Sequence, residues 1–137
     1  MRAIYINLLM WQKANQLCLR LHKVTNLLPS RERLFLSAKI RTSSEQIPLS
    51  IAEGSSCEYI RDFIKRLRIA YRLLIKVKTE VLIIRHLDYI SYDLHNMMDG
   101  EIEELIELIQ QMIRTLEVQK DALHPAFAYL GPPYICN

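Results

Sequence analysis

Residues 45–56, EQIPLSIAEGSS, place a proline inside a stretch that otherwise has the apolar spacing of an amphipathic helix. Pro48 removes one helical hydrogen bond and crowds the preceding turn, so we expect it to bend this helix. Gly54 is expected to end the helix as a left-handed C-cap, with Ser55 and Glu58 forming a capping box for the next one. The stretch therefore predicts two long helices that meet at a tight antiparallel turn.

Outward from this turn, apolar residues recur at steps of three and four along the chain, which is the period of helices with one buried face. Helices are expected over residues 8–28, 31–53, 56–86 and 91–123, with Asp88 or Ser91 as the cap of the last. In the second helix, the predicted inward side chains are Leu34, Phe35, Ala38, Ile47, Ile51 and Ala52. Long helices joined by short connections predict an all-α, antiparallel up-down-up-down four-helix bundle over residues 1–124.

The composition fits a helical globular domain. Half of the 137 residues are hydrophobic, and only three are glycine. Three cysteines without a CxxC pair fit a reducing compartment, and no uncharged apolar run reaches the roughly 18–20 residues that a membrane span needs. We therefore expect a soluble cytoplasmic protein. Residues 125–137, with three prolines, are expected to form a tail whose aromatic side chains either dock on the bundle or a partner, or fray.

Charge divides the chain into two unlike parts. Residues 1–78 carry 15 Lys/Arg and 5 Asp/Glu, a net charge of +10, whereas residues 79–137 carry 3 and 10, a net charge of −7. Such asymmetry favours a surface that faces a polyanion, association between opposite faces of two copies, or both.

The third predicted helix carries the clearest candidate binding surface. Five cations at spacings of 4, 3, 4 and 4 residues fall within an arc of about 80° on a helix, and we call them the basic ridge: Arg61, Lys65, Arg68, Arg72 and Lys76. Flexible cations at this spacing suit contacts with phosphates along a nucleic-acid backbone. Three further cations are candidates to extend this positively charged binding surface: Arg20, Lys23 and Arg41.

The spacing of the basic ridge is also compatible with two roles that involve no nucleic acid. The first is an ordinary solvated helix face. In the second, the ridge pairs with the acidic last helix of a neighbouring subunit, where four glutamates cluster: Glu101, Glu103, Glu104 and Glu107. In that case the protein is a protein-interaction scaffold, and the charge serves self-assembly or docking to a protein partner.

Catalytic and metal-binding patterns are missing from the sequence. A di-iron site in a helix bundle requires inward glutamates with ExxH pairs, and none of the four histidines follows a glutamate at that spacing. There is no glycine-rich phosphate loop, GxSxG motif or Cys–His signature. We expect a protein that is not an enzyme and that binds no metal or cofactor.

Three motifs carry a resemblance to a known family. The chain has MWQKA at residues 10–14 and IPLSIAEG at residues 47–54, with PSRER at residues 29–33 between them. In this order and spacing, the chain resembles the bacterial four-helix-bundle family of proteins encoded in 23S rRNA intervening sequences. The motif positions, which are structural in this resemblance, are Trp11, Pro48, Ile51, Glu53 and Gly54.

The resemblance implies more than a bundle. Relatives assemble as homopentameric barrels, and one related branch is the accessory variability protein of diversity-generating retroelements, which binds nucleic acid and a reverse transcriptase. The resemblance thus implies a non-enzymatic nucleic-acid or ribonucleoprotein accessory. Together with the basic ridge, it leads us to expect a homo-oligomer that contacts structured RNA or DNA through backbone and shape.

Overall fold

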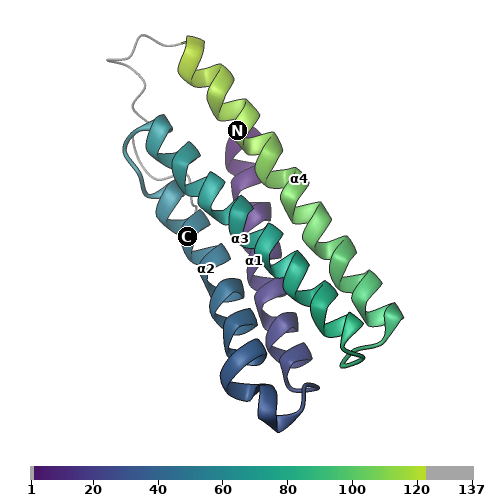
Figure 1. Ribbon diagram of the computed structural model, residues 1–137. Helices are drawn as coiled ribbons and strands as arrows, with labels where there is room; N and C mark the ends of the chain where they lie inside the picture. The colour runs from purple at the N-terminus through teal and green to yellow at the C-terminus, as the bar shows by residue number, and fades with distance from the viewer. Residues whose placement is uncertain (1, 123–137) are drawn as a thin grey trace.

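Four long antiparallel helices make up the part of the chain that the computed structural model describes, which is residues 2–122 (Figure 1). Their bounds are α1 (Arg2–Thr25), α2 (Ala38–Ser55), α3 (Ile60–His86) and α4 (Tyr92–Ala122). Each helix packs against the one before and after it, and α4 closes the bundle against α1. The predicted all-α four-helix bundle is therefore confirmed. The predicted tail lies outside the described residues.

The core forms where the apolar stripes of the four helices meet. Leu17 and Leu21 of α1 are almost fully buried, as are Ile47 and Ile51 of α2. Three side chains of α3 are also fully buried, namely Phe63, Leu67 and Leu74. On α4, the fully buried side chains include Leu105, Ile109 and Met112. Burial of these side chains supplies the main stabilising free energy of the bundle, at about 1.5–3 kcal/mol for each.

The connection between α1 and α2 differs from the prediction. A short 3-10 turn, Ser30–Glu32, and a π-helical turn, Arg33–Ser37, precede α2. Leu34 and Phe35, predicted to face the core, are 82% and 63% exposed. The prediction was wrong because Ser37 takes the buried position of this segment, which turns Leu34 and Phe35 outward.

Gly54 lies inside α2, so its predicted role as a left-handed C-cap is wrong. A Cβ atom at this position would lie 2.8 Å from Cδ1 of Phe63 and 3.0 Å from Cβ of Arg66. Glycine is therefore required because the end of α2 approaches α3 too closely for any side chain. The motif IAEG therefore marks a helix–helix contact in the last turn of α2 rather than a left-handed cap.

The predicted capping box of Ser55 and Glu58 is also wrong. The Ser55 hydroxyl donates back to the carbonyl oxygens of Ile51 and Ala52, at 3.0 and 2.9 Å, within the last turn of α2. Tyr59 instead occupies the N-cap position of α3, without a side-chain capping bond. In contrast, Ser91 does cap α4, since its hydroxyl oxygen accepts a hydrogen bond from the backbone N–H of Leu94 at 3.1 Å.

The helix α2 continues through Pro48 without interruption. In the preceding turn, the Ser44 hydroxyl donates to the carbonyl oxygen of Arg41 at 2.9 Å and is itself buried. Tertiary packing of Ile47 and Ile51 on either side of the proline holds this part of the helix in place. Among the residues that the structure describes, no helix is both long and apolar enough to cross a bilayer.

Candidate nucleic-acid interface

All five residues of the basic ridge are exposed on α3. They follow the outward side of the helix, because the residues between them, Phe63, Ile64, Leu67 and Ala70, are buried in the core. The ridge begins in the first turn of α3 and extends to Lys76, more than halfway along the helix. Five positive charges therefore lie along one solvent-facing edge of the bundle.

The ridge cations differ in whether they already have a partner. Arg68 forms an ion pair with Glu117 of α4 at 2.6 Å. The Arg61 guanidinium lies 5.8 Å from the centre of the Tyr59 ring and 4.0 Å from the Asp62 carboxylate. Lys65, Arg72 and Lys76 form no ion pair with any residue of the described part of the chain. These three charges are open to an external anion.

Glu80 lies one turn beyond Lys76 and faces α2. Burial raises the pKa of this carboxyl, while nearby Lys76, the Ser43 hydroxyl and Lys39 act in the opposite direction. One Glu80 oxygen, Oε1, is buried with no hydrogen-bond partner. Lys39 of α2 and Lys76 of α3 therefore both act on the charge of one buried acid.

The structure does not bring Arg20 and Lys23 to the basic ridge. Both lie on α1, which packs against α2 and α4 and lies across the bundle from α3 (Figure 1). Arg20 binds the Glu101 carboxylate of α4 at 3.0 Å. Lys23 is exposed on the same helix and forms no ion pair among the described residues.

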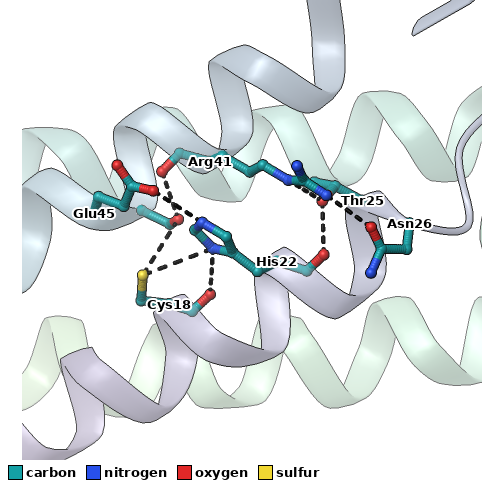
Figure 2. A network of polar contacts seen from close by, with 7 residues as sticks. Cys18, His22, Thr25, Asn26, Arg41 and Glu45 are labelled. Atoms are coloured by element: carbon teal, nitrogen blue, oxygen red, sulfur yellow. Dashed lines mark hydrogen bonds and ion pairs between the residues drawn. The ribbon is translucent and has the colours of Figure 1, made fainter. Parts of the chain in front are cut away.

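Arg41 belongs to a polar network between α1 and α2 (Figure 2). Its Nε donates to the Thr25 hydroxyl at 2.8 Å, and its Nη2 donates to the Asn26 side-chain oxygen at 2.7 Å. On the other side of the network, His22 bonds to Glu45 at 2.9 Å. Arg41 thus ties the end of α1 to α2, where a cation also compensates the helix dipole. Its geometry fits a structural role better than a contact with nucleic acid.

The acidic residues of α4 are largely paired within the chain. Glu101 binds Arg20, and Glu104 binds Lys13 at 2.8 Å, both on α1. Lys78 of α3 binds Glu103 and also Asp99, the latter at 3.3 Å; the bond with Glu103 raises the pKa of Lys78. These contacts join α4 to both neighbouring helices. We call Glu101, Glu103, Glu104 and Glu107 the acidic row. Three of these four glutamates have partners within the chain, whereas Glu107 is exposed and forms no ion pair among the described residues.

The motif residues of the resemblance have packing roles. Ile51 is fully buried, and Pro48 is half-buried at the surface of α2. Glu53 binds Arg66 of α3 at 3.3 Å, next to the close approach at Gly54. Trp11 is 37% exposed on α1. Glu53 and Gly54 thus stabilise the contact between α2 and α3 and position the helix that carries the ridge.

A shallow hollow beside the ridge was not identified from the sequence. It lies between α3 and α4 and is lined by Arg68, Tyr71, Gln110, Ile113 and Arg114. Periodicity assigned Tyr71 to the core, where it is only partly buried. Arg114 is one of only three Lys/Arg residues in the acidic part of the sequence, residues 79–137. A lone cation among acidic residues was the sequence signal that could have pointed to this hollow. Within residues 2–122, no three His, Cys, Asp or Glu side chains form a group that could hold a metal.

The fold and this surface define a helical-bundle protein with a cationic outward face on its third helix. The chain belongs to the 23S rRNA-intervening sequence protein family, whose family model matches residues 6–111. This match confirms the resemblance drawn from the WQKA and IAEG motifs.

A solved structure shows the same fold. It is the crystal structure of a protein of unknown function from the S23 ribosomal protein family of Bacteroides thetaiotaomicron VPI-5482. The two chains are 18% identical and superpose with a TM-score of 0.74, over 80% of this chain and 98% of that one. A search of curated proteins gives no match.

Proposed function

We propose that this protein is a non-enzymatic accessory that binds structured RNA or DNA through the basic ridge of α3. The observation that carries this proposal is the contrast in pairing. Lys65, Arg72 and Lys76 are exposed without an ion pair among the described residues, whereas three of the four clustered glutamates of α4, Glu101, Glu103 and Glu104, are paired within the chain. Exposed cations spaced along one edge neutralise phosphates and release counterions, without reading base sequence.

The proposal includes a homo-oligomer, with a pentamer as the expected size from the family resemblance. A ring would repeat the ridge, so that weak contacts of one subunit add up through effective concentration. A reverse transcriptase or another ribonucleoprotein component is the proposed protein partner. Membership of a family described by its 23S rRNA intervening sequences supports an RNA-related role.

The direct test is a salt series of binding to a structured RNA and to duplex DNA. The ridge variant carries Gln at Arg61, Lys65, Arg68, Arg72 and Lys76. If the three unpaired cations contact phosphates, the log–log slope of affinity against salt is about −2.7 on B-DNA, rising to about −4.5 if Arg61 and Arg68 also do, and it flattens in the variant. A wild-type protein that binds neither nucleic acid at low salt contradicts the proposal.

A matched control removes five positive charges elsewhere, with Gln at Lys23, Arg31, Arg33, Arg85 and Lys120. It has the same net charge as the ridge variant, so a general loss of attraction affects both equally. We expect the control to keep most of the affinity and of the salt slope. Equal losses in the two variants would mean that net charge, and not the ridge, decides binding.

A protein-interaction scaffold is the second candidate, and one observation favours it. Leu27, Leu34 and Phe35, in the connection between α1 and α2, are 60%, 82% and 63% exposed. Large exposed apolar side chains within one segment are typical of contacts with protein. If this segment joins subunits, Leu34→Ser with Phe35→Ser reduces the oligomer size in light scattering while each subunit keeps its helicity. An unchanged size would remove this segment from the assembly contact.

A further inference from the structure

The hollow between α3 and α4 shares one residue with the basic ridge. Arg68 belongs to both, and Arg72 of the ridge follows Tyr71 by one position on α3. The opposite wall comes from Gln110, Ile113 and Arg114 of α4. A molecule held by its backbone on the ridge would therefore have this hollow within reach of its bases.

Two of the residues that line the hollow, Tyr71 and Ile113, present largely apolar side chains. Tyr71 and Ile113 are partly buried and pack against the core cluster. The Tyr71 hydroxyl has no hydrogen-bond partner in the described part of the chain. An aromatic ring that is held by packing but still partly exposed is a surface on which a planar group can stack.

Two other residues that line the hollow, Arg68 and Arg114, are cations. Arg114 is exposed and forms no ion pair within residues 7–122. Arg68 is already held by Glu117, whose carboxylate disfavours a phosphate at that point. The open ridge residue next to Tyr71, Arg72, is thus the better phosphate contact, while Gln110 offers an exposed amide to the edge of a base.

We propose that this hollow receives an unstacked base of single-stranded nucleic acid, which lies on Tyr71 between Arg68 and Arg114. The inference rests on the proposed function, because the ridge must hold the backbone for the base to enter. It also narrows the class of nucleic acid that is expected to bind, from any structured RNA or DNA to one with unpaired bases. Bases inside a duplex are stacked and cannot reach Tyr71, whereas loops and single strands expose them to aromatic and guanidinium groups.

The test compares a labelled single-stranded RNA of about 12 nucleotides with the duplex of the same sequence, by fluorescence anisotropy at one salt concentration. We expect Tyr71→Ala to weaken single-strand binding about tenfold, the scale for loss of one stacked base, and to leave duplex binding within about twofold. Tyr71→Phe keeps the ring and is the matched control, with wild-type affinity expected. Circular dichroism of each variant checks that the bundle is folded.

A second variant avoids the core altogether. Arg114→Gln changes an exposed side chain, and Arg85→Gln, in the last turn of α3, removes the same charge away from the hollow. We expect a several-fold loss for single strands with Arg114→Gln alone. If Tyr71→Ala and Arg114→Gln leave single-strand binding unchanged while the ridge variant abolishes it, the hollow is not a base site and the proposed function still holds. If the wild-type protein binds neither RNA, both proposals fail.

Discussion

The outward face of α3 and the acidic row of α4 both carry several charges, but the two faces differ in what those charges contact. Glu101, Glu103 and Glu104 of α4 bind cations of the neighbouring helices α1 and α3. Lys65 and Arg72 of α3 point to solvent and have no such partner among the described residues. Charge that is paired within the chain contributes to the fold, whereas unpaired charge on one edge remains available for a polyanion.

The strongest test of this contrast reverses the unpaired charges. With Lys65→Glu, Arg72→Glu and Lys76→Glu, we expect a loss of affinity for structured RNA of about a hundredfold or more, because attraction to phosphates becomes repulsion. Lys65→Glu and Arg72→Glu should change the thermal unfolding temperature little, since both side chains are exposed, whereas Lys76→Glu places a second negative charge near the buried Glu80 and should lower it. Anisotropy titration and thermal melting of the same preparations measure both. A retained affinity would place the binding surface elsewhere.

Gly54→Ala probes the opposite behaviour, a loss of stability without a loss of binding chemistry. The added Cβ would meet Phe63 at 2.8 Å, and Phe63 is fully buried, so α2 and α3 must separate. Overpacking of this kind costs about 1–3 kcal/mol of unfolding free energy. Urea denaturation measures it. The folded fraction should still bind RNA, and Gly100→Ala, where a Cβ meets nothing within 4 Å, is the control that should not be destabilised.

Lys76 and Lys78 allow the contrast to be tested with two lysines on the same helix. Lys76 lies on the ridge, whereas Lys78 binds Asp99 and Glu103 of α4. Lys76→Gln should weaken RNA binding several-fold, with a small loss of stability because Lys76 also lies near the buried Glu80. Lys78→Gln should keep the affinity and reduce the unfolding free energy by about 0–1 kcal/mol, as for other surface ion pairs. An exchange of these two outcomes would contradict the division between paired and unpaired charge.

Replacing Glu80 should have the smallest effect of these changes, and its effect on thermal stability should depend on pH. Because burial raises the pKa of this carboxyl in the folded state, its contribution to stability is most favourable in acid. That contribution is lost as the pH rises through the pKa of the folded state. Glu80→Gln should therefore melt at a higher temperature than wild type near neutral pH, and the gap should close below about pH 4, near the ordinary pKa of glutamate. A constant gap across pH would exclude this origin.

Periodicity predicted the bundle well, because core packing requires apolar side chains at steps of three and four. It was wrong at the helix ends. Leu34 and Phe35 are large apolar residues of the kind that a core usually buries. In the structure, however, the π-helical turn buries Ser37 and leaves both of them exposed. Gly54 is a glycine near a helix end, which is typical of a C-cap. In the structure, however, the close approach of α3 is what requires a glycine there. Local signals cannot distinguish these cases, because the deciding contact comes from a distant part of the chain.

By itself, the sequence determined the all-α bundle, the family and the row of five cations, since each depends on spacing along one helix. Only the tertiary structure decided which charges remain free. It placed Arg41 in the contact between α1 and α2, paired Glu101 and Glu104 with α1, and put Arg114 beside Tyr71. The reason is physical: an ion pair or a hollow depends on distances between helices, and periodicity within one helix does not specify which residues of its neighbours it meets.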